Sequence, residues 1–68
     1  MNEEVFNMSV RKFLKTVGVT AQREIENAVR DAVAAGNIPE SGKLKAEARV
    51  TVDGVDVDFA VNGFIQLS

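Results

Sequence analysis

Four residue types that often carry chemistry are missing: the chain has no histidine, cysteine, tyrosine or tryptophan among its 68 residues. Without histidine the chain lacks the commonest general base, and without cysteine it lacks a thiol nucleophile, thiolate metal ligands and disulfides. The serines are Ser9, Ser41 and Ser68, and none has a spacing to a lysine or carboxylate that suggests an activating base. We therefore expect no enzyme, no catalytic residue and no cofactor site.

Long apolar runs and an excess of positive charge are also missing. No run approaches the roughly 20 apolar residues that cross a bilayer, so we expect no membrane segment. Glu3 and Glu4 stand where a secretory signal would carry basic residues. The formal net charge of -2 supplies no general attraction to nucleic acid phosphates or anionic lipids. Together with the missing cysteines, which fit a reducing compartment, these features predict a cytoplasmic protein.

The short length leaves room for a single domain, residues 1–68. A chain of this size buries a modest core, whose hydrophobic gain barely exceeds the conformational entropy lost on folding. Association with another chain would add to that gain.

The stretch from Leu44 to Leu67 predicts a three-stranded antiparallel meander. Apolar and polar residues alternate on both sides of Asp53-Gly54, a dipeptide typical of a two-residue type I′ turn. This turn places Val52 opposite Val55 and gathers the apolar side chains on one face. The same pairing sets Arg49 across from Asp58 on the other face.

A second turn is predicted at Asn62-Gly63. A two-residue turn would direct Ile65 outward, so we favour a three-residue loop, 61–63, with Gly63 in the left-handed conformation. This choice leaves Phe64 and Ala60 on the outer face, where they form a candidate interface.

Two helices are predicted before the meander. Asn2 caps the first, and apolar residues at helical spacing follow up to Val17, before Gly18 ends the helix. Thr20 caps the second, which Gly36-Asn37 ends, with Glu26 and Arg30 spaced for an i,i+4 pair. The predicted fold is α+β in the order ααβββ, with both helices packed on one face of the meander. Its core centre is expected at Phe6, Phe13, Leu14, Ile25, Val29, Val50, Val57, Phe59 and Ile65.

One carboxylate cluster needs an interpretation. Asp53, Asp56 and Asp58 are oxygen ligands of the kind calcium prefers, but their order differs from that of the calcium-binding loop. A turn residue and two solvated side chains account for them better. We expect no metal site.

Two surface features on the first helix have alternative interpretations. Val5 and Met8 lie off the main apolar stripe and are either incidental surface apolarity, which we favour, or a partner contact. Arg11, Lys12, Lys15 and Arg23 cluster around the junction of the predicted helices and are either a solvated face, again favoured, or a basic patch.

The leading functional prediction is a small non-enzymatic interaction module, with another protein or a second copy of itself as partner in a homodimer. The short chain, the unguarded sheet edges and the Phe64/Ala60 spot support it. The alternative is a weak nucleic-acid-binding protein with a helix-turn-helix and a wing at Asp53-Gly54. Acidic residues on the second helix and at the hairpin tip make nucleic acid an unfavourable partner.

The run MNEEVFNMSVRKFLKTVGVTAQREIENAVRDA, with the Asp53-Gly54-Val55 hairpin, resembles a small family of uncharacterised bacterial proteins. The resemblance implies a bacterial cytoplasmic setting. It implies no activity, cofactor, partner or site residue.

Overall fold

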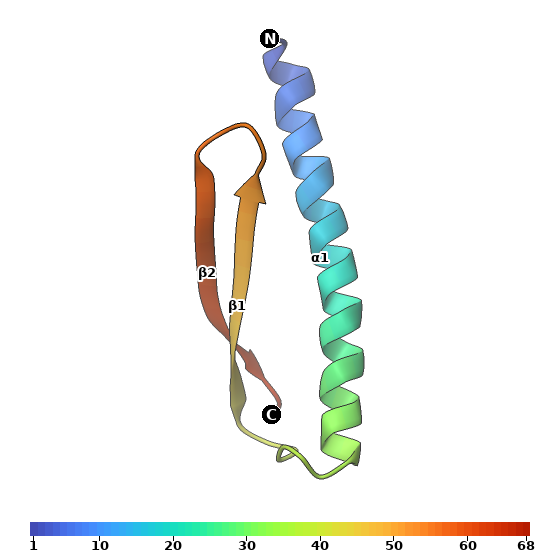
Figure 1. Ribbon diagram of the computed structural model, residues 1–68. Helices are drawn as coiled ribbons and strands as arrows, with labels where there is room; N and C mark the ends of the chain where they lie inside the picture. Colours follow the sequence, from blue (N-terminus) through green and yellow to red (C-terminus); the bar gives the residue numbers. More distant parts are fainter. The chain divides into compact units, whose positions relative to one another are not determined.

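The computed structural model describes all 68 residues and contains one helix and one β-hairpin (Figure 1). The helix α1 spans Glu3–Ala34, and the strands β1 and β2 span Lys43–Val52 and Val57–Gln66. The chain divides into two compact units, Met1–Ile38 and Pro39–Ser68, which are described separately. The element order is therefore αββ, and the predicted ααβββ fold is wrong in both its helical and its sheet part.

Helix α1 begins where the sequence predicts. Asn2 has an extended backbone, and its side-chain oxygen accepts a hydrogen bond from the backbone N–H of Val5 at 3.1 Å. This bond satisfies one of the N–H groups that have no partner within the helix. Glu3 and Glu4 lie in the first turn, where the positive end of the helix dipole favours carboxylates.

The helix continues through Gly18, so the predicted helix end at this residue is wrong. Gly18 keeps a helical backbone without a positive φ, and Thr20 lies inside the helix and caps nothing. A glycine inside a helix costs only about 1 kcal/mol relative to alanine. The apolar residues before and after Gly18 also follow one 3.6-residue period, so a single helix aligns both sets on one face. With no turn near Gly18, the helix-turn-helix of the nucleic-acid alternative does not exist in this fold.

The helix ends as predicted, at Gly36-Asn37. Gly36 has a φ of 76°, a left-handed conformation that glycine adopts without a steric penalty. Its N–H donates to the carbonyl of Val33, and the N–H of Asn37 donates to the carbonyl of Ala32 at 2.9 Å. This pair of bonds is a Schellman motif, which satisfies carbonyl groups of the last helical turn.

The first predicted turn is present in a longer form than expected. Val52 lies opposite Val57, so a four-residue loop from Asp53 to Asp56 replaces the two-residue turn. A type I′ turn needs a positive φ at both of its central residues, whereas only Gly54 has one here, at 86°. The register therefore differs by two residues from the predicted one. Because side chains alternate with a period of two, residues that lie in both the predicted and the observed strands keep their predicted face, whereas Val55 lies in the loop.

The second predicted turn, at Asn62-Gly63, is wrong. Both residues lie inside β2, opposite Glu47 and Ala46, and Gly63 has no positive φ. The uninterrupted strand pairs ten residues with β1, whereas a meander would have left only a short third strand after Gly63. The continuous strand gives every residue of β1 a partner, whereas the predicted loop at 61–63 would leave the first residues of β1 unpaired.

Neither unit has a hydrophobic core. Within each unit by itself, no side chain is buried. Among the nine expected core residues, Val29, Val50, Val57 and Ile65 are half-buried, and the other five are exposed. The core prediction is wrong because each unit by itself is a single layer, and burial of an apolar face needs a second layer.

Candidate interaction surfaces

The first surface is an apolar stripe along α1, here called the helix stripe. At about 100° per residue its members fall within one sector of the helix. Large side chains on it are open to solvent, with Phe13 55% and Leu14 50% exposed. The stripe comprises Phe6, Val10, Phe13, Leu14, Val17, Ala21, Ile25, Ala28 and Ala32. A surface helix of a folded protein normally turns such a stripe toward a core.

The second surface is one side of the hairpin, here called the hairpin apolar face. Strand alternation places ten residues on it without a single charge. Phe59 lies opposite Val50 and is 51% exposed. The face comprises Leu44, Ala46, Ala48, Val50, Val52, Val57, Phe59, Val61, Gly63 and Ile65.

The opposite side of the hairpin, the hairpin charged face, contains both members of the predicted Phe64/Ala60 interface. Phe64 is paired with Lys45 and Ala60 with Arg49, so charged residues of β1 flank both. Phe64 is 59% exposed, and the ammonium of Lys43 lies 4.4 Å from the centre of its ring. A cation over an aromatic face is mildly stabilising. Phe64 and Ala60 thus share a face, as predicted, but they are separate spots on a polar surface.

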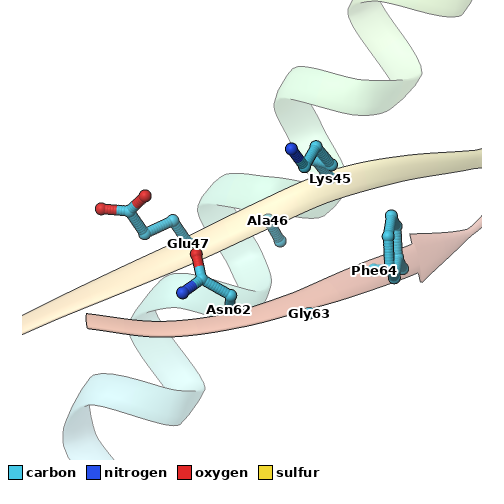
Figure 2. A pocket seen from close by; sticks show the side chains of 6 residues that line it. All are labelled: Lys45, Ala46, Glu47, Asn62, Gly63 and Phe64. Carbon is cyan, nitrogen blue, oxygen red and sulfur yellow. The ribbon is translucent and has the colours of Figure 1, made fainter.

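A shallow hollow of about 320 Å³ crosses the middle of the hairpin at this face. Figure 2 shows its lining: Lys45, Ala46, Glu47, Asn62, Gly63 and Phe64. The hollow lies between two cross-strand pairs of this face, Lys45–Phe64 and Glu47–Asn62, and the backbone of Ala46 and Gly63 forms its floor. Its lining carries an ammonium, a carboxylate and an amide without the enclosure that a small-molecule site normally has.

Val5 and Met8 lie on the side of α1 away from the helix stripe. They share a shallow, open hollow with three residues of the predicted basic patch, Arg11, Lys12 and Lys15. Arg23, the fourth, lies eleven residues beyond Lys12 on the same helix, about 16 Å along the axis, and is outside this hollow. The structure therefore brings the two candidate features of the first helix together, except for Arg23.

A comparison with protein families shows which family the chain belongs to. A model of a family of unknown function, DUF6494, matches residues 1–68. The chain belongs to the DUF6494 family. This confirms the resemblance to a family of uncharacterised proteins. No curated protein and no solved structure matches the chain.

Three further sequence predictions for this DUF6494 chain concern a metal site, an ion pair and a membrane segment. No group of three acidic, histidine or cysteine side chains that could hold a metal ion is present, and Asp53, Asp56 and Asp58 do not converge. Arg49 lies opposite Ala60 and not opposite Asp58 as predicted, but its side chain reaches Asp58 diagonally and donates two hydrogen bonds to the carboxylate, with nitrogen–oxygen distances of 2.9 and 3.1 Å. No helix combines the length and the apolarity that crossing a membrane requires.

The most extensive of these surfaces, the helix stripe, is not predicted from the sequence as a single feature. A helix end at Gly18 divides its residues between two helices and assigns them to a core. The signal that identifies it is the common phase of the apolar residues on both sides of Gly18, which a 3.6-residue period carries through the glycine without a break.

Proposed function

We propose that this DUF6494 chain is a small, non-enzymatic interaction module that associates with a second copy of itself. The observation that carries the proposal is that neither unit by itself buries a side chain, although 46% of the residues are hydrophobic. Apolar stripes and faces of this size are normally covered, because each fully buried Leu, Val or Phe side chain stabilises a fold by about 1.5–3 kcal/mol.

The stability of the separate elements supports the need for a partner. A two-stranded hairpin is marginally stable at best in water, and helical stability in proteins comes mostly from packing of an apolar face. The ion pairs add little, because Glu26–Arg30 and Arg49–Asp58 are both largely exposed. Burial of the helix stripe and the hairpin apolar face is the remaining large source of stability.

The lengths of the elements show that the chain's own hairpin cannot cover the whole helix stripe, wherever it lies. The helix stripe runs from Phe6 to Ala32 and extends about 39 Å, whereas a strand of ten residues extends about 33 Å. About one helical turn of the stripe therefore remains for another molecule. A second copy of the chain supplies apolar surface of the same dimensions.

The chemistry of the side chains supports a non-enzymatic role. The chain has no histidine or cysteine to act as base or nucleophile, and its open hollows enclose no group that could be activated by burial. The proposal includes a bacterial cytoplasmic setting, which the family resemblance and the lack of cysteine support.

Sedimentation velocity over a wide concentration range, with two matched variants, tests the proposal. Val17 lies on the helix stripe, and Val19 lies on the far side of α1, about 200° away, with both side chains exposed. We expect a dimer for the wild-type chain and a dissociation constant at least about tenfold higher for Val17→Glu, since tenfold corresponds to only about 1.4 kcal/mol. Val19→Glu introduces the same charge and should associate like the wild type.

Circular dichroism of both variants checks that helix content is retained. A wild-type chain that remains monomeric up to millimolar concentration would rule out self-association. Equal weakening by the two substitutions would show that the helix stripe is not the contact.

A further inference from the structure

The two outer edges of the hairpin differ in how well they are protected. Each strand of a two-stranded sheet has a row of backbone N–H and C=O groups without a partner. Charged side chains, lysine above all, are the usual protection of such an edge. In β1 four of ten residues are charged, whereas in β2 only Asp58 is. The edge of β2 is therefore the open one.

Asp58, the single charged residue of β2, does not protect the outer edge of this strand. The carboxylate of Asp58 binds the guanidinium of Arg49 through two hydrogen bonds, so it is directed toward β1 and its charge is offset there. Proline, the other common protection, is absent from β2.

The hydrogen-bond phase of the hairpin shows which backbone groups are free. The N–H of Leu67 donates to the carbonyl of Gly42 at 2.8 Å, in line with the register of β1 and β2. In an antiparallel ladder, alternate residues direct their backbone groups to the same neighbour. The odd-numbered residues of β2 therefore bond to β1, and the groups of the even-numbered ones point outward: Asp58, Ala60, Asn62, Phe64 and Gln66.

We propose that β2 pairs antiparallel with β2 of a second copy about a two-fold axis at Asn62, giving a continuous four-stranded sheet. The inference rests on the self-association proposed above and adds the edge of β2 to the helix stripe as a contact surface. Because the faces must match, only registers that differ by two residues are allowed.

The register centred on Asn62 is self-complementary. On the hairpin charged face it sets Phe64 against the small Ala60 of the second copy, and Asp58 against the neutral Gln66. On the hairpin apolar face it sets Phe59 against Ile65, and Val61 against Gly63, which has open space above it. No charge meets a like charge, and the aromatic side chains meet small or aliphatic ones. Centring the axis on Val61 would instead place the carboxylate of Asp58 against Phe64.

This pairing unites two predicted interface residues that the hairpin itself keeps apart. Phe64 and Ala60 lie four residues apart on one strand. In the proposed dimer, Phe64 of each copy lies opposite Ala60 of the other copy, so the two-fold axis generates this contact twice. It also doubles the width of the hairpin apolar face without exposing a new charge.

Single-cysteine variants test the contact cleanly, because the chain has no cysteine of its own. Asn62→Cys places two thiols at the axis, where hydrogen-bonded antiparallel residues have Cα atoms about 5.5 Å apart, within the range of a disulfide. The control is Glu47→Cys, since Glu47 lies opposite Asn62 on β1 and on the same face. After mild oxidation at micromolar concentration, we expect at least about ten times more disulfide dimer for Asn62→Cys, measured by intact mass.

A proline variant provides a second readout. The N–H of Asn62 points outward and bonds to nothing in β1, so Asn62→Pro removes an edge donor and spares the hairpin ladder. We expect the dissociation constant of the dimer to rise at least about tenfold while the hairpin signal in circular dichroism persists.

The outcomes separate the two proposals. A wild-type dimer in which Asn62→Cys cross-links and Glu47→Cys does not supports pairing through β2. A wild-type dimer with no Asn62→Cys cross-link, or with equal cross-linking of the control, overturns the β2 contact and leaves self-association standing. A monomer at every concentration overturns both.

Discussion

At the scale of single residues, the side chains of this chain interact mainly at the surface. Arg49 and Asp58 form the best-aligned pair, with a bidentate geometry, and yet their side chains are 67% and 52% exposed. The sequence predicted this pair although its register was displaced by two residues, because the displacement kept both side chains on one face and within reach across the strands. Its contribution to stability should therefore be small.

The first prediction concerns this pair. A double-mutant cycle with Arg49→Ala and Asp58→Ala should give a coupling energy of about 0.2–1 kcal/mol, as exposed ion pairs do. The coupling should shrink in 1 M salt, where charges are screened within about 3 Å. Urea unfolding of the four proteins measures it. A coupling above about 2 kcal/mol would mean that the pair is desolvated, as it would be inside an interface.

At the scale of elements, the extent of α1 depends on the backbone conformations of two glycines, Gly18 and Gly36. Gly18 has a helical backbone, and a Cβ added to it would meet no atom within 4 Å, whereas Gly36 has a left-handed backbone at a φ of 76°. From the sequence, both residues were predicted to have the same role, that of a helix end. The structure separates them, because only Gly36 is followed by the hydrogen bonds of a C-terminal cap.

The substitutions Gly18→Ala and Gly36→Ala are predicted to have opposite effects on the stability of the protein. Gly18→Ala should stabilise the protein by about 0.5–1 kcal/mol, because alanine loses less backbone entropy in a helix than glycine. Gly36→Ala should destabilise it by about 1–2 kcal/mol, the usual penalty of a left-handed conformation for a residue with a Cβ. Thermal unfolding followed by circular dichroism at 222 nm measures both. Destabilisation by Gly18→Ala would indicate a break in the helix at that residue.

In the hairpin, too, two glycines with similar sequence signals have different conformations. Asn62-Gly63 is a strong turn signal, and Asp53-Gly54 is another. In the structure only Gly54 adopts a positive φ, while Gly63 pairs with Ala46 as an ordinary strand residue. The open edge and the small Gly63 are therefore properties of one long β2, which the predicted meander would have divided.

At the scale of the whole molecule, the feature to explain is a chain rich in hydrophobic residues whose two units, each by itself, bury none of them. Neither the helix alone nor the hairpin alone supplies the burial that offsets the conformational entropy of 68 ordered residues. The self-association proposed above supplies it from a second copy, so folding and association should be coupled.

Coupling predicts a thermal midpoint that depends on protein concentration. For a dimer of this size, each tenfold increase should raise Tm by roughly 5 °C, since the free energy of dissociation follows the concentration by mass action. Scanning calorimetry or circular dichroism from about 5 to 500 μM measures the shift. A Tm that stays constant across this range would show that the monomer folds without a partner.

Local sequence signals suffice to predict the start of α1 at Asn2, its end at Gly36-Asn37, and the faces of the strand residues outside 61–63. These features depend on local chemistry: a cap, a left-handed glycine, and the alternation of side chains along a strand. Whether Gly18 and Gly63 interrupt their elements, and which residues pair across the hairpin, is known only from the folded structure. Glycine is compatible with helix, strand and turn alike, so the choice falls to the longest helix and the longest ladder that the remaining chain can form.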